Sequence, residues 1–140
     1  MARTSTAARI RFVGAERIPT KAGRVRVRVT LEVSSGKLSG TAEAPAGDEG
    51  ELQAAAEATI DALARVLTAQ NARDIHFQIR EVGPFDAFGN AGVMVAIRME
   101  HGAAIRSLLG FSPFSDDAAR AASLAVLSAT NRILALRPRG

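Results

Sequence analysis

The sequence contains no cysteine, no tryptophan and no tyrosine among its 140 residues. Without cysteine the chain can form neither a disulfide framework nor a thiolate metal site. Phenylalanine supplies all of the aromatic residues, which make up only 4% of the chain. The core must therefore be built from Val, Ile, Leu and Ala, and a core so rich in small side chains favours support from a partner chain.

Long apolar runs are also missing, since no stretch approaches the ~20 residues that a membrane-spanning helix needs. The first residues, MARTSTAARIRF, contain arginine but lack the hydrophobic region of a secretory signal. We therefore expect a cytoplasmic protein that does not associate with a membrane. The chain is 47% hydrophobic and 23% charged, which is typical of a globular domain. Its net charge of +4 permits association with a polyanion without demonstrating it.

Two Ala-rich segments, residues 53–67 and 118–134, resemble each other at a fixed offset. In both, apolar side chains recur at the i, i+3, i+4 spacing of one helical face. A shift of 67 positions superposes identical or similar residues: Arg65 on Arg132, Val66 on Ile133, Leu67 on Leu134, Ile60 on Leu127 and Ala55 on Ala122. This internal similarity predicts a duplicated unit.

Strand patterns precede each helix. The clearest is residues 24–33, where five apolar side chains alternate with Arg24, Arg26, Arg28, Thr30 and Glu32. The other predicted strands are residues 8–13 and 37–44 in the first half, and residues 75–82, 93–99 and 103–111 in the second.

Single residues within and between these segments predict close packing, turns and helix starts. Gly40 lets another backbone or the following helix approach closely. The stretch 83–92, GPFDAFGNAG, reads as a long turn. In the sixth strand we expect Ile105, Leu109 and Phe111 to face inward. Ser115 or Asp116 is the expected N-cap of the second helix.

The order strand-strand-strand-helix, repeated twice, predicts an α+β fold. It is a duplicated βββα unit, with antiparallel sheet or sheets and two helices packed on one face. The pattern does not choose between one continuous sheet and two packed units. We expect residues 1–7 to form a flexible tail, residues 8–70 the first half and residues 71–140 the second half of one compact domain.

The outward strand faces of the two halves differ. The first presents a row of arginines: Arg9, Arg11, Arg24, Arg26 and Arg28. The second presents Met94, Ala96 and Leu108, with Arg98 and Arg106 among them. Because an exposed apolar face is typical of a contact surface, we expect the second half to form a homodimer.

Two groups of residues together resemble a known family. The first is the acidic pair Asp116-Asp117, the Ala122-Ser123 step and the tract 128–134. The second is Gly83, Asp86, Ala87, Gly89, Val93 and Val95, in that order. This pattern, over roughly residues 24–136, resembles the C-terminal regulatory domain of 2-isopropylmalate synthase. The chain departs from it by the insertion of Pro84-Phe85 and by Ser112 at the place of a glycine.

The resemblance implies a domain that mediates dimer contacts and binds a small amino-acid-like effector. It places Asp86, Ala87 and Gly89, and Gly110 at the end of the sixth strand, near the effector pocket. The family's catalytic barrel is missing from the 140 residues, so a stand-alone regulator would act on a separate client enzyme. From the residues alone, Asp86 and Asn90 either bond the turn backbone or contact the ligand.

No nucleophile elbow, Walker loop, dinucleotide-binding fingerprint or HExxH motif occurs. We therefore expect a non-catalytic protein without a cofactor. The pair Asp74 and His76 offers two ligands on one strand, whereas a metal site needs three or four, so we expect no metal.

Two alternatives stay open. The arginine row, Arg9, Arg11, Arg24, Arg26 and Arg28, favours a nucleic-acid-binding face. No aromatic residue lies between these arginines, which argues against base stacking. The same row is also typical of a solvated face whose arginines pair with Glu32 and Glu43. The other alternative is a structural subunit of a larger assembly.

Overall fold

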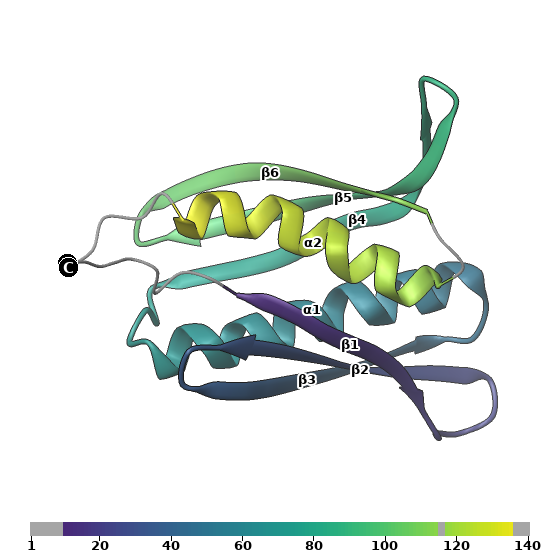
Figure 1. The fold of residues 1–140 in the computed structure, drawn as a ribbon, viewed down its shortest axis with the longest axis horizontal. Helices are drawn as coiled ribbons and strands as arrows, with labels where there is room; N and C mark the ends of the chain where they lie inside the picture. The colour runs from purple at the N-terminus through teal and green to yellow at the C-terminus, as the bar shows by residue number, and fades with distance from the viewer. Residues whose placement is uncertain (1–9, 115–116, 136–140) are drawn as a thin grey trace.

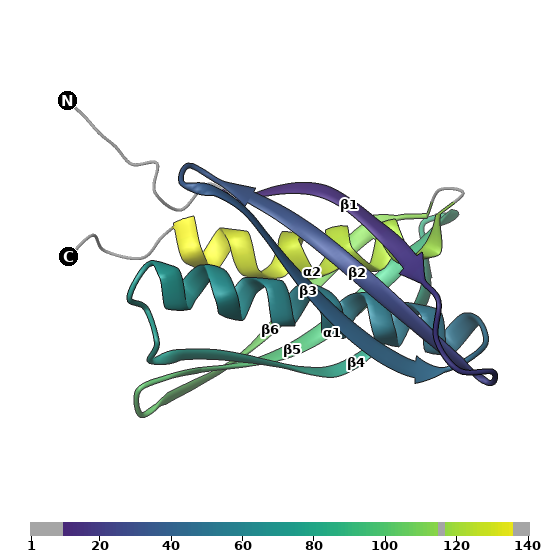
Figure 2. The same ribbon diagram turned by 90° about the horizontal axis from the view of Figure 1, so that it is seen from below.

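The computed structural model describes residues 10–114 and 117–135 and has three layers, with two helices lying side by side between two sheets (Figures 1 and 2). The predictions made for residues 1–9, 115–116 and 136–140, Arg9 among them, fall outside the described residues.

The elements follow the predicted order. The first half contains β1 (Arg11–Ile18), β2 (Arg24–Val33), β3 (Gly36–Pro45) and α1 (Asp48–Ala69). The second half contains β4 (Ile75–Ala87), β5 (Asn90–His101), β6 (Ala104–Pro113) and α2 (Ala118–Ala135). Both sheets are antiparallel, in the orders β1-β2-β3 and β4-β5-β6. The α+β fold with a duplicated βββα unit is confirmed, and the open choice resolves as two separate three-stranded sheets.

Strand β2 has the predicted bounds and the predicted alternation. Val27, Val29 and Leu31 are fully buried beneath α1, while the arginines between them face away from the helices. Two other elements differ at their ends. β1 continues to Ile18, five residues past the predicted end, and α1 extends beyond the Ala-rich segment 53–67 at both ends.

Each helix lies against a glycine of its own sheet. A Cβ atom added to Gly40 would lie 2.3 Å from the Ala62 nitrogen, and one added to Gly110 would lie 2.0 Å from the Ala125 oxygen. Ala58 and Ala62 on α1 correspond to Ala125 and Ala129 on α2, which is again a shift of 67. The close approach predicted for Gly40 is confirmed, and its repetition at Gly110 shows the duplication in the packing itself.

The helices start at the same end of the molecule and run parallel (Figures 1 and 2). Each one packs on its own sheet, on the other helix and on a strand of the other half: α1 on β4, and α2 on β1. Between the helices, the Thr59 hydroxyl donates to the Ala55 carbonyl at 2.7 Å and lies 3.0 Å from the Ser123 hydroxyl. This polar pair is fully buried and satisfied at the centre of the middle layer.

The predicted inward face of β6 is wrong. Leu108 is buried, whereas Ile105 and Leu109 are 60% and 59% exposed. The reason is register: β6 pairs Leu108 with Ile97, and opposed residues in a sheet share a face. Because Ile97 faces the helices, Leu108 does too, and its odd-numbered neighbours face solvent.

The predicted long turn at residues 83–92 is also wrong. β4 continues through Ala87 and β5 begins at Asn90, so the connection is the two residues Phe88 and Gly89. Their φ angles of 55° and 77° are those of a primed hairpin turn, which matches the twist of the flanking strands. Pro84 is tolerated within β4 because this strand lies at the sheet edge.

Candidate functional site

Four of the predicted ligand-binding residues, Asp86, Ala87, Gly89 and Asn90, lie on the end of the β4–β5 hairpin. We call residues 86–91 the arm. The arm rises away from the helices and beyond the rest of the molecule (Figure 1). Phe88 at its turn is completely exposed.

The two polar side chains of the arm behave differently. The Asn90 amide donates to the Phe88 carbonyl at 3.3 Å and so stabilises the turn. The Asp86 side chain has no hydrogen-bond or ion-pair partner among residues 10–114 and 117–135. The turn-bonding role considered for both residues is therefore filled by Asn90, which leaves the Asp86 carboxylate available to a ligand or a partner.

Gly110 is not brought together with the arm. It pairs with Val95, which lies five residues along β5 from Asn90, or about 17 Å at the rise of a strand. Gly110 faces α2, where any side chain would meet the Ala125 oxygen and Ala129. Its lack of a side chain is explained by helix packing.

The outer side of the second sheet carries an apolar face. It consists of Phe85, Met94, Ala96, Ile105, Leu109 and Phe111. The rings of Phe85 and Phe111 meet edge to face with centroids 6.0 Å apart, and Phe111 covers Gly92. Met94 and Ala96 lie on the outer face as predicted. Leu108 and Arg106, which were predicted there, share the helix-facing side with Met99 and Ile97.

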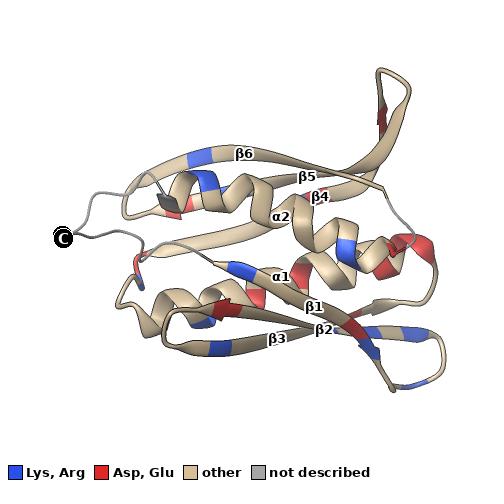
Figure 3. Ribbon diagram, in the orientation of Figure 1, with Lys and Arg blue, Asp and Glu red and all other residues tan. Residues whose placement is uncertain are grey.

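The outer side of the first sheet carries a basic face, which we define as Arg11, Arg24, Arg26, Arg28 and Lys37. Figure 3 shows basic and acidic residues interspersed along this sheet. Arg11 pairs with Glu32, and Arg28 with Glu16 at 2.9 Å. The predicted pairing with Glu32 and Glu43 is confirmed, and Glu16 is a further partner that the sequence did not indicate.

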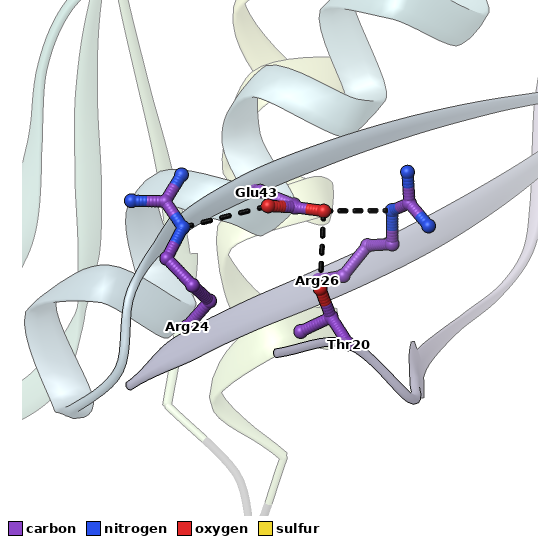
Figure 4. Close-up of polar contacts among 4 residues, drawn as sticks. All are labelled: Thr20, Arg24, Arg26 and Glu43. Carbon is purple, nitrogen blue, oxygen red and sulfur yellow. Dashed lines mark hydrogen bonds and ion pairs between the residues drawn. The ribbon is translucent and has the colours of Figure 1, made fainter. Parts of the chain in front are cut away.

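Glu43 lies between two arginines of the basic face (Figure 4). Its carboxylate contacts the Nε atoms of Arg24 and Arg26 at 3.4 and 3.3 Å, and the Thr20 hydroxyl donates to it at 3.1 Å. The Thr20 hydrogen bond, together with Arg24 and Arg26, holds the pKa of Glu43 below its usual 4.5. The hydrogen bond and charge of Arg11 similarly lower the pKa of Glu32.

Two open clefts lie where the helices begin. One, of about 540 Å³, lies between β1 and the first turns of α1 and α2, and the other, of about 380 Å³, lies beside the β1–β2 turn. They share Arg17, Asp48 and Glu51, and Arg17 bonds Glu51 at 2.7 Å. No pattern in the sequence indicated this ion pair, because Arg17 lies beyond the predicted end of its strand.

Two acidic residues at the helix starts have structural roles. Asp48 opens α1, where a negative charge suits the helix dipole. The Asp117 carboxylate accepts from the Arg120 backbone N–H at 3.1 Å and so caps α2. Ser115 and Asp116, which were predicted as the N-cap, lie outside the described residues. The described helix begins at Ala118, directly after Asp117.

The two residues considered as a ligand pair, Asp74 and His76, have different neighbours. Asp74 bonds His101 at 3.0 Å, while His76 lies opposite Glu100. Within residues 10–114 and 117–135, no three side chains of the metal-binding types converge. None of the helices described there is long and apolar enough to cross a membrane.

Comparison with known proteins gives no identification, since no family model and no curated protein matches the sequence. The resemblance to a regulatory domain therefore stays a prediction. The features of the molecule that bear on its function are the arm, the apolar face, the basic face and the clefts.

Proposed function

We propose that this chain is a non-catalytic, self-associating module that senses a small amino-acid-like ligand, similar in kind to the C-terminal regulatory domain of 2-isopropylmalate synthase. The observation that carries the proposal is the apolar face of the second sheet. Phe85, Ile105 and Leu109 are 40%, 60% and 59% exposed there. Met94 pairs with Phe111 and Ala96 pairs with Leu109 in neighbouring rows, whereas the Arg98–Ser107 pair separates Ile105 from them. An exposed apolar surface of this kind is typical of a protein contact.

A second copy of the chain is the occupant that we propose for this face. Three strands about 4.8 Å apart and about 33 Å long cover on the order of 500 Å². A stable interface needs about 800 Å² on each partner, so the flat face alone is too small. The arm, with Phe88 fully exposed, supplies further apolar area at the edge of the same sheet. In a twofold dimer each arm would contact the partner.

The ligand would lie between the arm and the neighbouring subunit. Asp86 offers an unpaired carboxylate for an ammonium group, and Phe85 and Phe88 offer apolar contacts beside it. The arm is exposed in the single chain, so the site would be enclosed only in the dimer. A ligand bound there would favour one subunit arrangement over another, and a client enzyme would respond to that shift.

Sedimentation at micromolar concentration tests self-association. We expect the wild type to be a dimer and Leu109→Glu to be a monomer, because a charge buried at the interface is costly. Phe88→Asn should weaken the dimer while keeping the turn, since Asn-Gly is a preferred primed turn. Val13→Glu, an equally drastic change at an exposed position of β1, serves as the control and should stay dimeric. A wild type that sediments as a monomer would contradict the proposal.

Thermal shift with branched-chain amino acids tests the ligand. We expect a rise in Tm that persists at moderate salt and is lost in Asp86→Asn. Asp48→Asn, which removes an acid from the clefts instead, should keep the response. If Asp48→Asn abolished the shift and Asp86→Asn did not, the ligand would bind at the helix starts and the arm site would be wrong. A purely structural subunit would show no shift with any variant.

A further inference from the structure

We infer that the basic face of the first sheet binds the phosphate backbone of a nucleic acid without reading its bases. Five basic side chains, Arg11, Arg24, Arg26, Arg28 and Lys37, share this face with three carboxylates, Glu16, Glu32 and Glu43. The second sheet lies on the far side of the helices (Figures 1 and 2). The inference therefore stands independently of the proposed dimer.

The arrangement of the arginines fits a repeating anion. Arg24, Arg26 and Arg28 occupy alternate positions of one strand, so they form a row with a spacing of about 6.7 Å. Successive phosphates of an extended strand repeat on a comparable scale. The residue type also fits, because only two of the 18 basic residues of the chain are lysines. The planar guanidinium group matches phosphate with two parallel hydrogen bonds.

The ion pairs of this face do not use up its donors. Glu43 is shared by Arg24 and Arg26, and both contact it through Nε. Figure 4 shows the terminal nitrogens of both arginines turned away from the carboxylate. The arginine side chains of the face are between 42% and 71% exposed. Exposed pairs of this kind contribute little, so a phosphate can join or replace the carboxylate.

Among the described residues, the face offers no aromatic platform on which bases could stack. Its other outward residues in the register are Gly14, Ile18, Thr30, Ser39, Thr41 and Pro45, and no aromatic ring lies among them. Sheet-based RNA-binding proteins hold single strands by stacking the bases on aromatic side chains. Binding here should therefore be indifferent to sequence and strongly dependent on salt.

Fluorescence anisotropy with a labelled short oligothymidylate, between roughly 50 and 200 mM salt, tests the inference. We expect affinity to fall with salt, and Arg24→Gln/Arg26→Gln to reduce the log–log salt slope by about 1.4, since each single-strand phosphate contact contributes about 0.7. The control is Arg65→Gln, which removes one exposed charge from α1 and should leave the slope unchanged. Oligomers of other base compositions should bind equally well.

A variant that is expected to raise the affinity serves as a check, because a loss of affinity in the double mutant could also come from misfolding. Glu43→Gln releases Arg24 and Arg26 and should tighten binding several-fold. The inference is overturned if Arg65→Gln matches the double mutant, if Glu43→Gln weakens binding, or if the protein binds anionic lipid vesicles but no oligonucleotide. Leu109→Glu should bind the short oligonucleotide normally, so failure of the dimer and failure of this face are distinguishable.

Discussion

At the scale of single residues, Gly40 and Gly110 fix how closely each helix approaches its own sheet. Both lie where an added Cβ atom would contact helix backbone, at 2.3 Å and 2.0 Å respectively. Gly40 was recognised from the sequence because it interrupts an alternating strand. At Gly110 the sequence pattern alone could not separate helix packing from ligand binding, because the absence of a side chain suits both roles.

Replacing Gly110 by Ala separates the two roles. The new methyl group would overlap the Ala125 oxygen, so α2 must shift. Overpacking of this kind costs typically about 1–3 kcal/mol in the free energy of unfolding. Gly83→Ala is the matched control, because its Cβ atom would meet nothing within 4 Å. Chemical denaturation should show a large loss for Gly110→Ala and none for Gly83→Ala. Equal stabilities would show that the packing assigned to Gly110 is wrong.

Glu43 predicts a pH dependence at the same scale. Its pKa is lowered in the folded protein, first by the Thr20 hydrogen bond, so the unfolded state binds more protons at acid pH. The stabilisation by Glu43 is therefore present above pH 4.5 and lost as the pH falls through the lowered pKa. In an NMR titration, Thr20→Val should move the Glu43 midpoint up toward 4.5 and leave Glu32 unchanged. A Glu43 midpoint that stays put would remove Thr20 as the cause.

At the scale of elements, alternation predicted strands well where only one face was apolar. β2 carries valine and leucine at every second position and arginine, threonine or glutamate between, so both its bounds and its faces were predictable. β6 carries Ile105, Leu108, Leu109 and Phe111, which occupy both faces. Pairing with β5 decides which side of β6 faces the helices, and the sequence of β6 alone does not predict that register.

The arm shows a second limit at this scale. The glycines and Pro84 of the stretch 83–92, which includes the arm, resemble a loop, and only the conformations of Phe88 and Gly89 make this stretch a hairpin. A phenylalanine is uncommon at positive φ, so nothing within the predicted long turn marked Phe88-Gly89 as a two-residue turn. The four arm residues predicted as ligand contacts do lie together. The Arg17–Glu51 pair was missed because Arg17 lies in the part of β1 beyond the predicted strand end.

At the scale of the whole molecule, the duplication was predictable because two helices repeat at a shift of 67. The layer order was not, because a repeated unit does not say how its copies face each other. The structure places both helices in one middle layer, where α1 also packs on β4 and α2 on β1. Neither half therefore covers its own helix completely, and each depends on the other for burial.

This shared layer predicts one cooperative unfolding transition for the two halves. Gly40→Ala in the first half and Gly110→Ala in the second should each lower the Tm of the whole molecule, because loosening either helix exposes the other. Calorimetric and van't Hoff enthalpies should agree, as they do for a two-state domain. Hydrogen exchange should lose protection in both sheets together in either variant. Gly110→Ala could instead produce an early transition confined to β4–β6 and α2, while β1–β3 and α1 keep their protection. The two halves would then be independent domains, and the fully buried Thr59–Ser123 hydrogen bond between the helices would contribute little to the stability of their contact.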